Sequence, residues 1–119
     1  VYVDRSYCLH CNIGTALYTA LIEMLQLQNV KNLYALVADK NEKSFALHRK
    51  VGFEKIAVYN NIGYKFNEWH DVAIFEMLLG SGSSEVKALL LFPDIPPKTV
   101  REILEKCQNI IIRKISAEI

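Results

Sequence analysis

Apolar positions recur along this chain at two spacings, which predict helices and strands in alternation. Between residues 14 and 28 apolar residues come every three or four positions, as on one face of a helix. They are Leu17, Leu21, Met24 and Leu25. Residues 33–38 form a continuous apolar run of strand length, which is typical of a strand buried on both faces of a sheet. Residues 1–3 form a shorter strand-like run at the start of the chain.

The segment that follows the second strand predicts a short helix with clear boundary residues. Asn41 can accept hydrogen bonds from the first N–H groups of this helix. Gly52 can take the left-handed conformation that ends it. Lys50 and Arg49 lie favourably in its last turn, where the helix dipole attracts positive charge.

Two further strands are expected after this helix. Residues 54–59 predict a short strand and residues 71–79 the last one, with turns expected at residues 60–61 and at Gly63. The alternation of strands and helices predicts an α/β domain with a mixed or parallel sheet.

The composition changes at residue 80, and the tail beyond it predicts one more helix. Residues 80–84 are rich in glycine and serine, which indicates a flexible loop, and residues 86–93 are apolar enough to lie along the domain surface. Pro96 and Pro97 precede a helix pattern, and proline is well placed in the first turn of a helix. Its buried face is expected to consist of Val100, Ile103, Leu104 and Cys107.

Composition and charge exclude some classes of function. A chain of 119 residues predicts one domain, and a hydrophobic fraction of 51% is ample for a packed core. Fourteen basic and thirteen acidic residues leave a net charge of +1, so nothing favours nucleic acid as a partner. No apolar run reaches the length of a membrane span, and no segment reads as a signal peptide. We therefore expect neither a membrane nor a nucleic-acid partner.

Three cysteines, Cys8, Cys11 and Cys107, are an odd number that outlines no disulfide framework. A cytoplasmic location, where thiols stay reduced, is the simplest interpretation. Cys8 and Cys11 have a spacing found in zinc and redox sites, but structural zinc needs two more ligands, and His48, His70 and Cys107 are scattered. We expect ordinary thiols and no metal site.

Residues 41–53 strongly resemble a signature of the GNAT family of N-acetyltransferases, Asn-x-x-(Ser/Ala)-x-x-x-(Tyr/His)-x-x-x-Gly-(Phe/Tyr). Its positions are occupied here by Asn41, Ser44, His48, Gly52 and Phe53. The resemblance implies that Asn41 and Ser44 contact coenzyme A, and that His48, near the thioester sulfur, is catalytic. A histidine can exchange a proton near neutral pH. The alternative for His48 is a packing role as a half-buried residue on the helix face of Ser44.

A second resemblance lies at the start of the first predicted helix, where the family carries (Gln/Arg)-x-x-Gly-x-(Gly/Ala). Pyrophosphate binds the N–H groups at a helix N-terminus, and glycine lets the backbone approach it closely. This chain retains Gly14 but has Leu9 for the polar residue and Asn12 for the first glycine, and asparagine tolerates left-handed conformations. The implied cofactor-binding residues, together with the strand-like run that would offer N–H donors, are Val1, Tyr2, Val3, Leu9, Asn12, Ile13, Gly14 and Thr15.

Residues 63–72 resemble the narrower Gly-(Phe/Tyr)-Lys-x-x-x-Trp-x-Asp segment of phosphinothricin N-acetyltransferases. The resemblance implies a substrate-binding role for Tyr64, Trp69 and His70. The alternative is a loop that packs on the core as a lid. We expect Asp71 to fix this loop in place and not to act as a base.

These resemblances together imply an acyl-CoA N-acyltransferase (GNAT) fold of the α/β class, a mixed sheet flanked by helices with the N-terminal half missing. Residues 1–80 are expected to form the C-terminal part of that domain, and residues 81–119 an extension that packs on the domain or on a partner. The implied activity is transfer of acetyl from acetyl-CoA to the amino group of a small amino acid or analogue, in a homo-oligomer. The alternatives are a peptide or polyamine acceptor, or a degenerate, non-catalytic domain that acts by dimerisation or ligand sensing.

Overall fold

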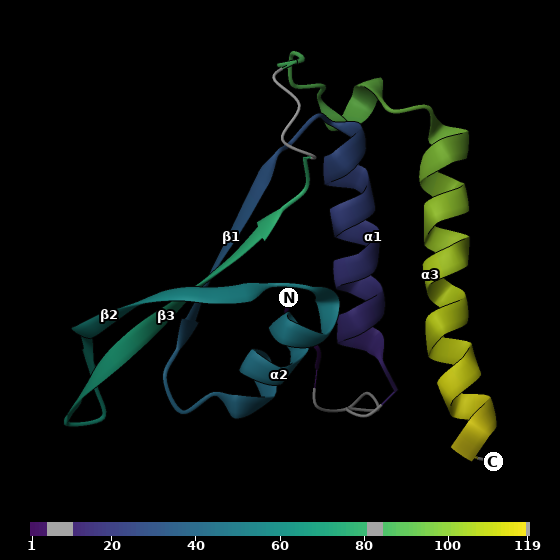
Figure 1. Ribbon diagram of the computed structural model, residues 1–119. Helices are drawn as coiled ribbons and strands as arrows, with labels where there is room; N and C mark the ends of the chain where they lie inside the picture. The colour runs from purple at the N-terminus through teal and green to yellow at the C-terminus, as the bar shows by residue number, and fades with distance from the viewer. Residues whose placement is uncertain (5–10, 81–84, 119) are drawn as a thin grey trace. The chain divides into compact units, whose positions relative to one another are not determined.

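The computed structural model describes the backbone of residues 1–4, 11–80 and 85–118, and the side chains among these as far as residue 111. The elements in chain order (Figure 1) are α1 (Ile13–Leu27), β1 (Asn32–Ala38), α2 (Glu42–Val51), β2 (Glu54–Lys65), β3 (Glu68–Leu78), a 3-10 helix η1 (Phe92–Asp94) and α3 (Pro97–Glu118). Helices and strands alternate as far as β2, so the α/β fold class expected from the sequence is confirmed.

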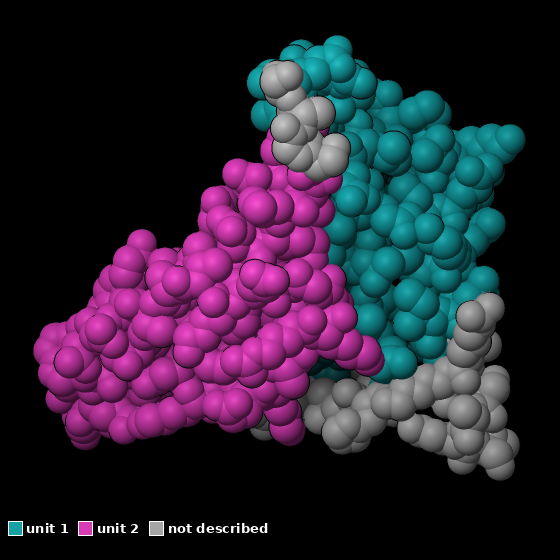
Figure 2. All heavy atoms as spheres, in the orientation of Figure 1, with its two compact units in different colours: residues 1–30, 84–119 teal, residues 31–83 magenta. Residues whose placement is uncertain are grey.

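The chain forms two compact units, which Figure 2 colours separately. One unit is helical and combines residues 1–30 with residues 84–119, whereas the other contains the sheet and spans residues 31–83. The expected division at residue 80 concerned domains of the complete protein and stays a prediction.

The helical unit is held together by apolar packing between α1 and α3. Ala20 of α1 is buried with Ile103 and Cys107 of α3, and Met24 packs against this cluster. Leu104 was also expected in the buried face, but 51% of it is exposed. Successive helical residues are rotated by about 100°, so a contact centred on residues 103 and 107 leaves residue 104 at its edge.

The segment before α3 is tied to the end of α1 by hydrogen bonds. The Leu90 N–H donates to the Gln28 carbonyl oxygen at 3.1 Å, and Gln28 Nε2 donates to the Leu90 carbonyl oxygen at 2.9 Å. Asn29 Nδ2 donates to the Ala88 carbonyl oxygen at 2.8 Å. These bonds fix an apolar, largely exposed stretch along the surface of its own unit, as its composition led us to expect.

The sheet unit contains three antiparallel strands in the order β1-β3-β2. The sequence led us to expect a mixed or parallel sheet, whereas the described strands pair only antiparallel; residues 1–4 have no strand geometry, and Val1 and Tyr2 are exposed.

Helix α2 covers one face of this sheet. The Phe45 and His48 rings of α2 each lie 5.4 Å from the ring of Phe75, which is fully buried. Val37 and Ala73 share the buried face. These side chains form the core of the sheet unit.

The opposite face of β1 is exposed, which corrects the expectation that this strand is buried on both faces. Within β1, Val37 is 5% exposed, whereas its neighbour Leu36 is 66% exposed. Successive residues of a strand point to opposite faces, so covering one face by α2 leaves the other to be covered by something else. A continuous apolar run does not reveal which faces are covered.

The segment expected to be a loop over residues 63–72 is a β-hairpin instead. Phe66 and Asn67, between the ends of β2 and β3, have φ angles of 56° and 60°, as in the type I′ turn that joins antiparallel strands. The expected turn at residues 60–61 is a bulge within β2, where Asn61 has φ 49° and its N–H donates to Asp71 Oδ1 at 2.7 Å. Asp71 thus fixes this segment, as expected.

Candidate functional site

The N-terminus of α1 presents backbone N–H groups that its N-cap residue does not cover. Asn12 has a left-handed backbone, with φ 59° and ψ 21°, and its side chain makes no capping hydrogen bond. The first intrahelical bond runs from the Ala16 N–H to the Asn12 carbonyl oxygen, so the N–H groups of Ile13, Gly14 and Thr15 precede it. Such donors, with the helix dipole behind them, suit an anionic group.

The start of α2 is built as its sequence predicts. Asn41 Oδ1 accepts a hydrogen bond from the Ser44 N–H at 3.2 Å, and Gly52 ends the helix with φ 110°. The side-chain oxygen of Asn41 is therefore used within the helix, and its Nδ2 group is the part that can donate to a ligand. Asn41, Ser44 and His48 follow one another along a single helix.

His48 is more deeply buried than the expected half-buried position. It is 5% exposed, and its ring packs against Phe53 and Phe75 with centroid distances of 5.4 Å. Nδ1 lies 2.6 Å from the Ser44 carbonyl oxygen, an acceptor, so Nδ1 carries the proton. In this tautomer Nε2 carries the lone pair.

His70 bridges two segments that are distant in sequence. Its Nδ1 lies 2.9 Å from Asp39 Oδ1, and its Nε2 lies 3.0 Å from the Lys65 carbonyl oxygen. The hydrogen bond to Asp39, followed by that to Lys65, raises the pKa of His70 above its ordinary value, and the same bond lowers the pKa of Asp39. The geometry gives His70 a role within the fold, and its predicted substrate contact stays a prediction.

Tyr64 and Trp69 form an exposed aromatic pair near the hairpin tip. Their rings meet edge to face at 5.1 Å, and the two residues are 60% and 59% exposed. They face solvent in the described structure, so the alternative of a lid packed on the core does not fit them. Their predicted substrate contact is not tested by this geometry.

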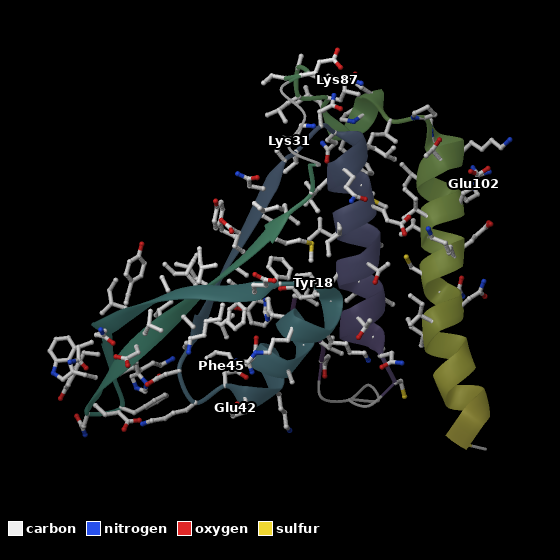
Figure 3. All side chains as sticks on the ribbon, in the orientation of Figure 1. Tyr18, Lys31, Glu42, Phe45, Lys87 and Glu102 are labelled. Atoms are coloured by element: carbon white, nitrogen blue, oxygen red, sulfur yellow. The ribbon has the colours of Figure 1, made fainter. Side chains whose placement is uncertain are left out.

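A hollow of about 390 Å³ lies on the sheet unit beside the start of α2, where Glu42 and Phe45 are labelled in Figure 3. Its lining consists of Asp39, Lys40, Glu42, Phe45, Lys55, Val58, Asn60, Asp71 and Ala73. None of the site residues predicted from the sequence is among these. Three carboxylates against two ammonium groups make the hollow unsuitable for a polyanion.

The remaining predicted positions lie in the helical unit or outside the described residues. Leu9 lies outside the described residues, and Val1, Tyr2 and Val3 lie in the helical unit together with residues 12–15. The sequence reasoning missed Asp39, Lys40 and Glu68, which surround His70. For Asp39 and Lys40, the only indication in the sequence was that two charged residues directly follow the strand predicted at residues 33–38.

The cysteines differ from the expectation of three ordinary thiols. Cys11 is disulfide-bonded, whereas Cys107 is free and buried. Among the residues that the structure covers, no three His, Cys, Asp or Glu side chains are grouped as a metal site would require. None of the described helices is both long enough and apolar enough to cross a membrane.

Comparison with known proteins identifies the family. The model of the GNAT acetyltransferase domain matches residues 1–74. An N-acetyltransferase of Streptomyces griseus is 38% identical over 73 residues, which are 61% of this chain and 38% of that protein. A phosphinothricin N-acetyltransferase of Streptomyces coelicolor is 38% identical over 64 residues, 54% of this chain and 37% of that one.

A solved structure has a similar fold. The yncA protein of Salmonella typhimurium, solved with its cofactor acetyl-CoA, superposes with a TM-score of 0.67 at 24% identity, over 73% of this chain and 49% of that one. This likeness concerns the fold alone. The chain spans less than half the length of each of these three proteins. Because the family match covers more than half of its 119 residues, the chain belongs to the GNAT acetyltransferase family.

Proposed function

We propose that this protein transfers an acetyl group from acetyl-CoA to the amino group of a small amino acid or an amino acid analogue. Membership of the GNAT family supports the reaction class, and the Streptomyces coelicolor relative, a phosphinothricin N-acetyltransferase, supports the class of acceptor. A homo-oligomeric state and a cytoplasmic location stay predictions from the sequence.

The observation that carries the proposal is the N-terminus of α1. Three N–H groups precede the first intrahelical bond there, and the side chain of the left-handed Asn12 makes no capping hydrogen bond. These residues fit the pyrophosphate of coenzyme A, because backbone donors at a helix N-terminus bind phosphate without a charged side chain. The predicted pyrophosphate-binding residues at the N-terminus of α1 therefore need no lysine or arginine among them.

Different residues of the chain bind the cofactor and exchange the proton. Residues 12–15 bind the pyrophosphate through backbone N–H groups, and Asn41 donates from Nδ2 while its Oδ1 caps α2. Acetyl-CoA, when bound, supplies an acetyl group activated as a thioester. His48 exchanges a proton at Nε2, since its Nδ1–H is directed at the Ser44 carbonyl oxygen.

A second candidate, a domain that binds its ligand without catalysing transfer, is favoured by one observation. His48 is buried between Phe53 and Phe75, as a packing residue would be. In this candidate acetyl-CoA still binds at α1, but no acetyl group is transferred.

An assay of thiol release separates the two candidates. Free coenzyme A is measured with a thiol reagent after acetyl-CoA is mixed with phosphinothricin, free amino acids, a polyamine or a short peptide. Faster release with an amino acid or phosphinothricin supports the proposal. Release only with the polyamine or peptide overturns the acceptor class. Calorimetric binding of acetyl-CoA without release supports the second candidate, and no binding overturns both.

A further inference from the structure

The ring of His70 is surrounded by groups that only accept hydrogen bonds. Nδ1 is 2.9 Å from a carboxylate oxygen of Asp39, and Nε2 is 3.0 Å from the backbone carbonyl oxygen of Lys65. A neutral imidazole carries one N–H and can donate to one of them, whereas an imidazolium donates to both. Both bonds are therefore complete only when His70 is protonated.

The charged groups around His70 form a short network. Asp39 and Lys40 come from the β1–α2 turn, and Glu68 from the start of β3. Glu68 Oε1 lies 3.6 Å from His70 Nε2, and Lys40 Nζ donates to Glu68 Oε2 at 2.9 Å. Lys65 offers its carbonyl oxygen, while its ammonium group lies over the Phe66 ring at 4.9 Å. Two carboxylates thus face one imidazolium and one ammonium.

This network holds a turn that has a strained backbone. Lys40 has φ 59°, a left-handed conformation that a lysine keeps only when its surroundings impose it. The Asp39 N–H donates to the Asp71 carbonyl oxygen at 2.9 Å, which anchors one end of the turn. The next residue after the turn is Asn41, whose side chain caps α2.

We propose that His70 is a positioning residue, which as an imidazolium clasps the β1–α2 turn to the β2–β3 hairpin and thereby fixes Asn41. The proposal rests on the proposed function in one respect, because there Asn41 lies beside coenzyme A. Loss of the His70 proton removes the positive charge that Asp39 faces and leaves one of the two bonds unmade, which weakens the hold on the strained turn and lowers the affinity for coenzyme A.

The direction of the pH dependence follows from the geometry and from the shifted pKa values. The folded-state pKa of His70 is raised by its bond to Asp39, so the clasp is complete below the ordinary histidine value of about 6.5 and is lost as pH rises through the raised value. The pKa of Asp39 is lowered by the same bond, so its contribution is present above about 3.9 and is lost as pH falls through the lowered value.

The clasp itself can be tested without a ligand. NMR gives the pKa of His70 from its ring protons, and the Asn41 side-chain amide signals report the position of the cap. We expect the Asn41 signals to shift with the pKa of His70, and Asp39→Asn to lower both transitions together. His70→Gln should abolish the transition. The proposal would be overturned if the Asn41 signals did not follow the titration of His70 in the unmodified protein. It would also be overturned if the transition of the Asn41 signals stayed at the same pH in Asp39→Asn.

Binding of coenzyme A supplies the second test. Above the pKa of His70 the affinity should fall, by about tenfold per pH unit at most, until the weaker-binding deprotonated form predominates. His70→Gln should remove this dependence, and Glu23→Gln, which breaks the ion pair to Lys106 in the helical unit, should retain it. Equal pH dependence in His70→Gln and the unmodified protein refutes the positioning role. If coenzyme A binds at no pH, the proposed function fails, and the NMR titration still decides the clasp.

Discussion

Replacement of Asn12 tests whether the left-handed backbone at the start of α1 governs binding of acetyl-CoA. Asn12 has φ 59° and ψ 21°. That conformation costs an ordinary L-residue roughly 1–2 kcal/mol, while asparagine bears less of this cost and glycine almost none. The series Gly, Asn, Ala at this position therefore varies the strain at a single backbone position.

The strain changes affinity through the fraction of molecules whose loop presents the N–H groups of Ile13 and Gly14. A difference of about 1 kcal/mol changes that fraction, and the apparent affinity with it, roughly fivefold when other loop conformations are open. We expect Asn12→Ala to bind acetyl-CoA about fivefold more weakly than the unmodified protein. Asn12→Gly should bind as tightly or up to about fivefold more tightly, since it also removes the Cβ from the path of the phosphates.

Isothermal titration calorimetry with acetyl-CoA measures the three affinities, and Asn61 provides a matched control. Asn61 is also left-handed, with φ 49°, but it lies in the bulge of β2 in the sheet unit. Asn61→Gly and Asn61→Ala should alter thermal stability and leave the affinity for acetyl-CoA unchanged. Equal affinities for Asn12→Gly and Asn12→Ala, or weaker binding by the glycine variant, would refute the reasoning.

Three further predictions concern the sheet unit. Phe66→Asn should stabilise the hairpin by about 0.5 kcal/mol, because relief of roughly 1 kcal/mol of turn strain exceeds the loss of an exposed cation–π contact. Chemical denaturation measures the change in the free energy of unfolding, and we expect a smaller increase for Asn67→Gly. A lower free energy of unfolding in Phe66→Asn would contradict the turn argument. In a form of the protein that transfers acetyl, His48→Ala should lower kcat about a hundredfold, with partial recovery in His48→Tyr. An unchanged kcat per folded molecule, with a lower Tm, would make His48 a packing residue. Phe75→Ala should lower the free energy of unfolding by about 3 kcal/mol or more, and Leu36→Ala, on the exposed face, by about 0.5 kcal/mol or less. Comparable losses in the two variants would contradict a core on one face of the sheet.

The sequence by itself determined the features that depend on a few neighbouring residues. The start of α2 at Asn41 and its end at Gly52 follow from side-chain and backbone hydrogen bonds that span three or four positions. The tolerance of Asn12 for a left-handed backbone is equally local, and the structure has that conformation. The family was also evident from such local motifs, and the match over residues 1–74 confirms it.

Other features could not be predicted from local pattern. The apolar run of β1 has the composition of a strand buried on both sides, yet only the face under α2 is covered. Residues 63–72 carry no Asn-Gly or Asp-Gly signal at their turn, so the hairpin forms with Phe66 in a conformation that glycine would favour. The strand pairing decided both outcomes, because a ladder fixes register and exposure together.

Within the candidate site, the sequence placed Asn41, Ser44 and His48 on one helix because helical neighbours are set by spacing alone. It did not predict the burial of His48, which depends on Phe75 from a distant strand. It also did not predict the partner of His70, since Asp39 lies 31 positions earlier. Only the antiparallel pairing of β1 with β3 brings the turn that follows β1 to the start of β3, and this proximity makes His70 a charged link within the fold.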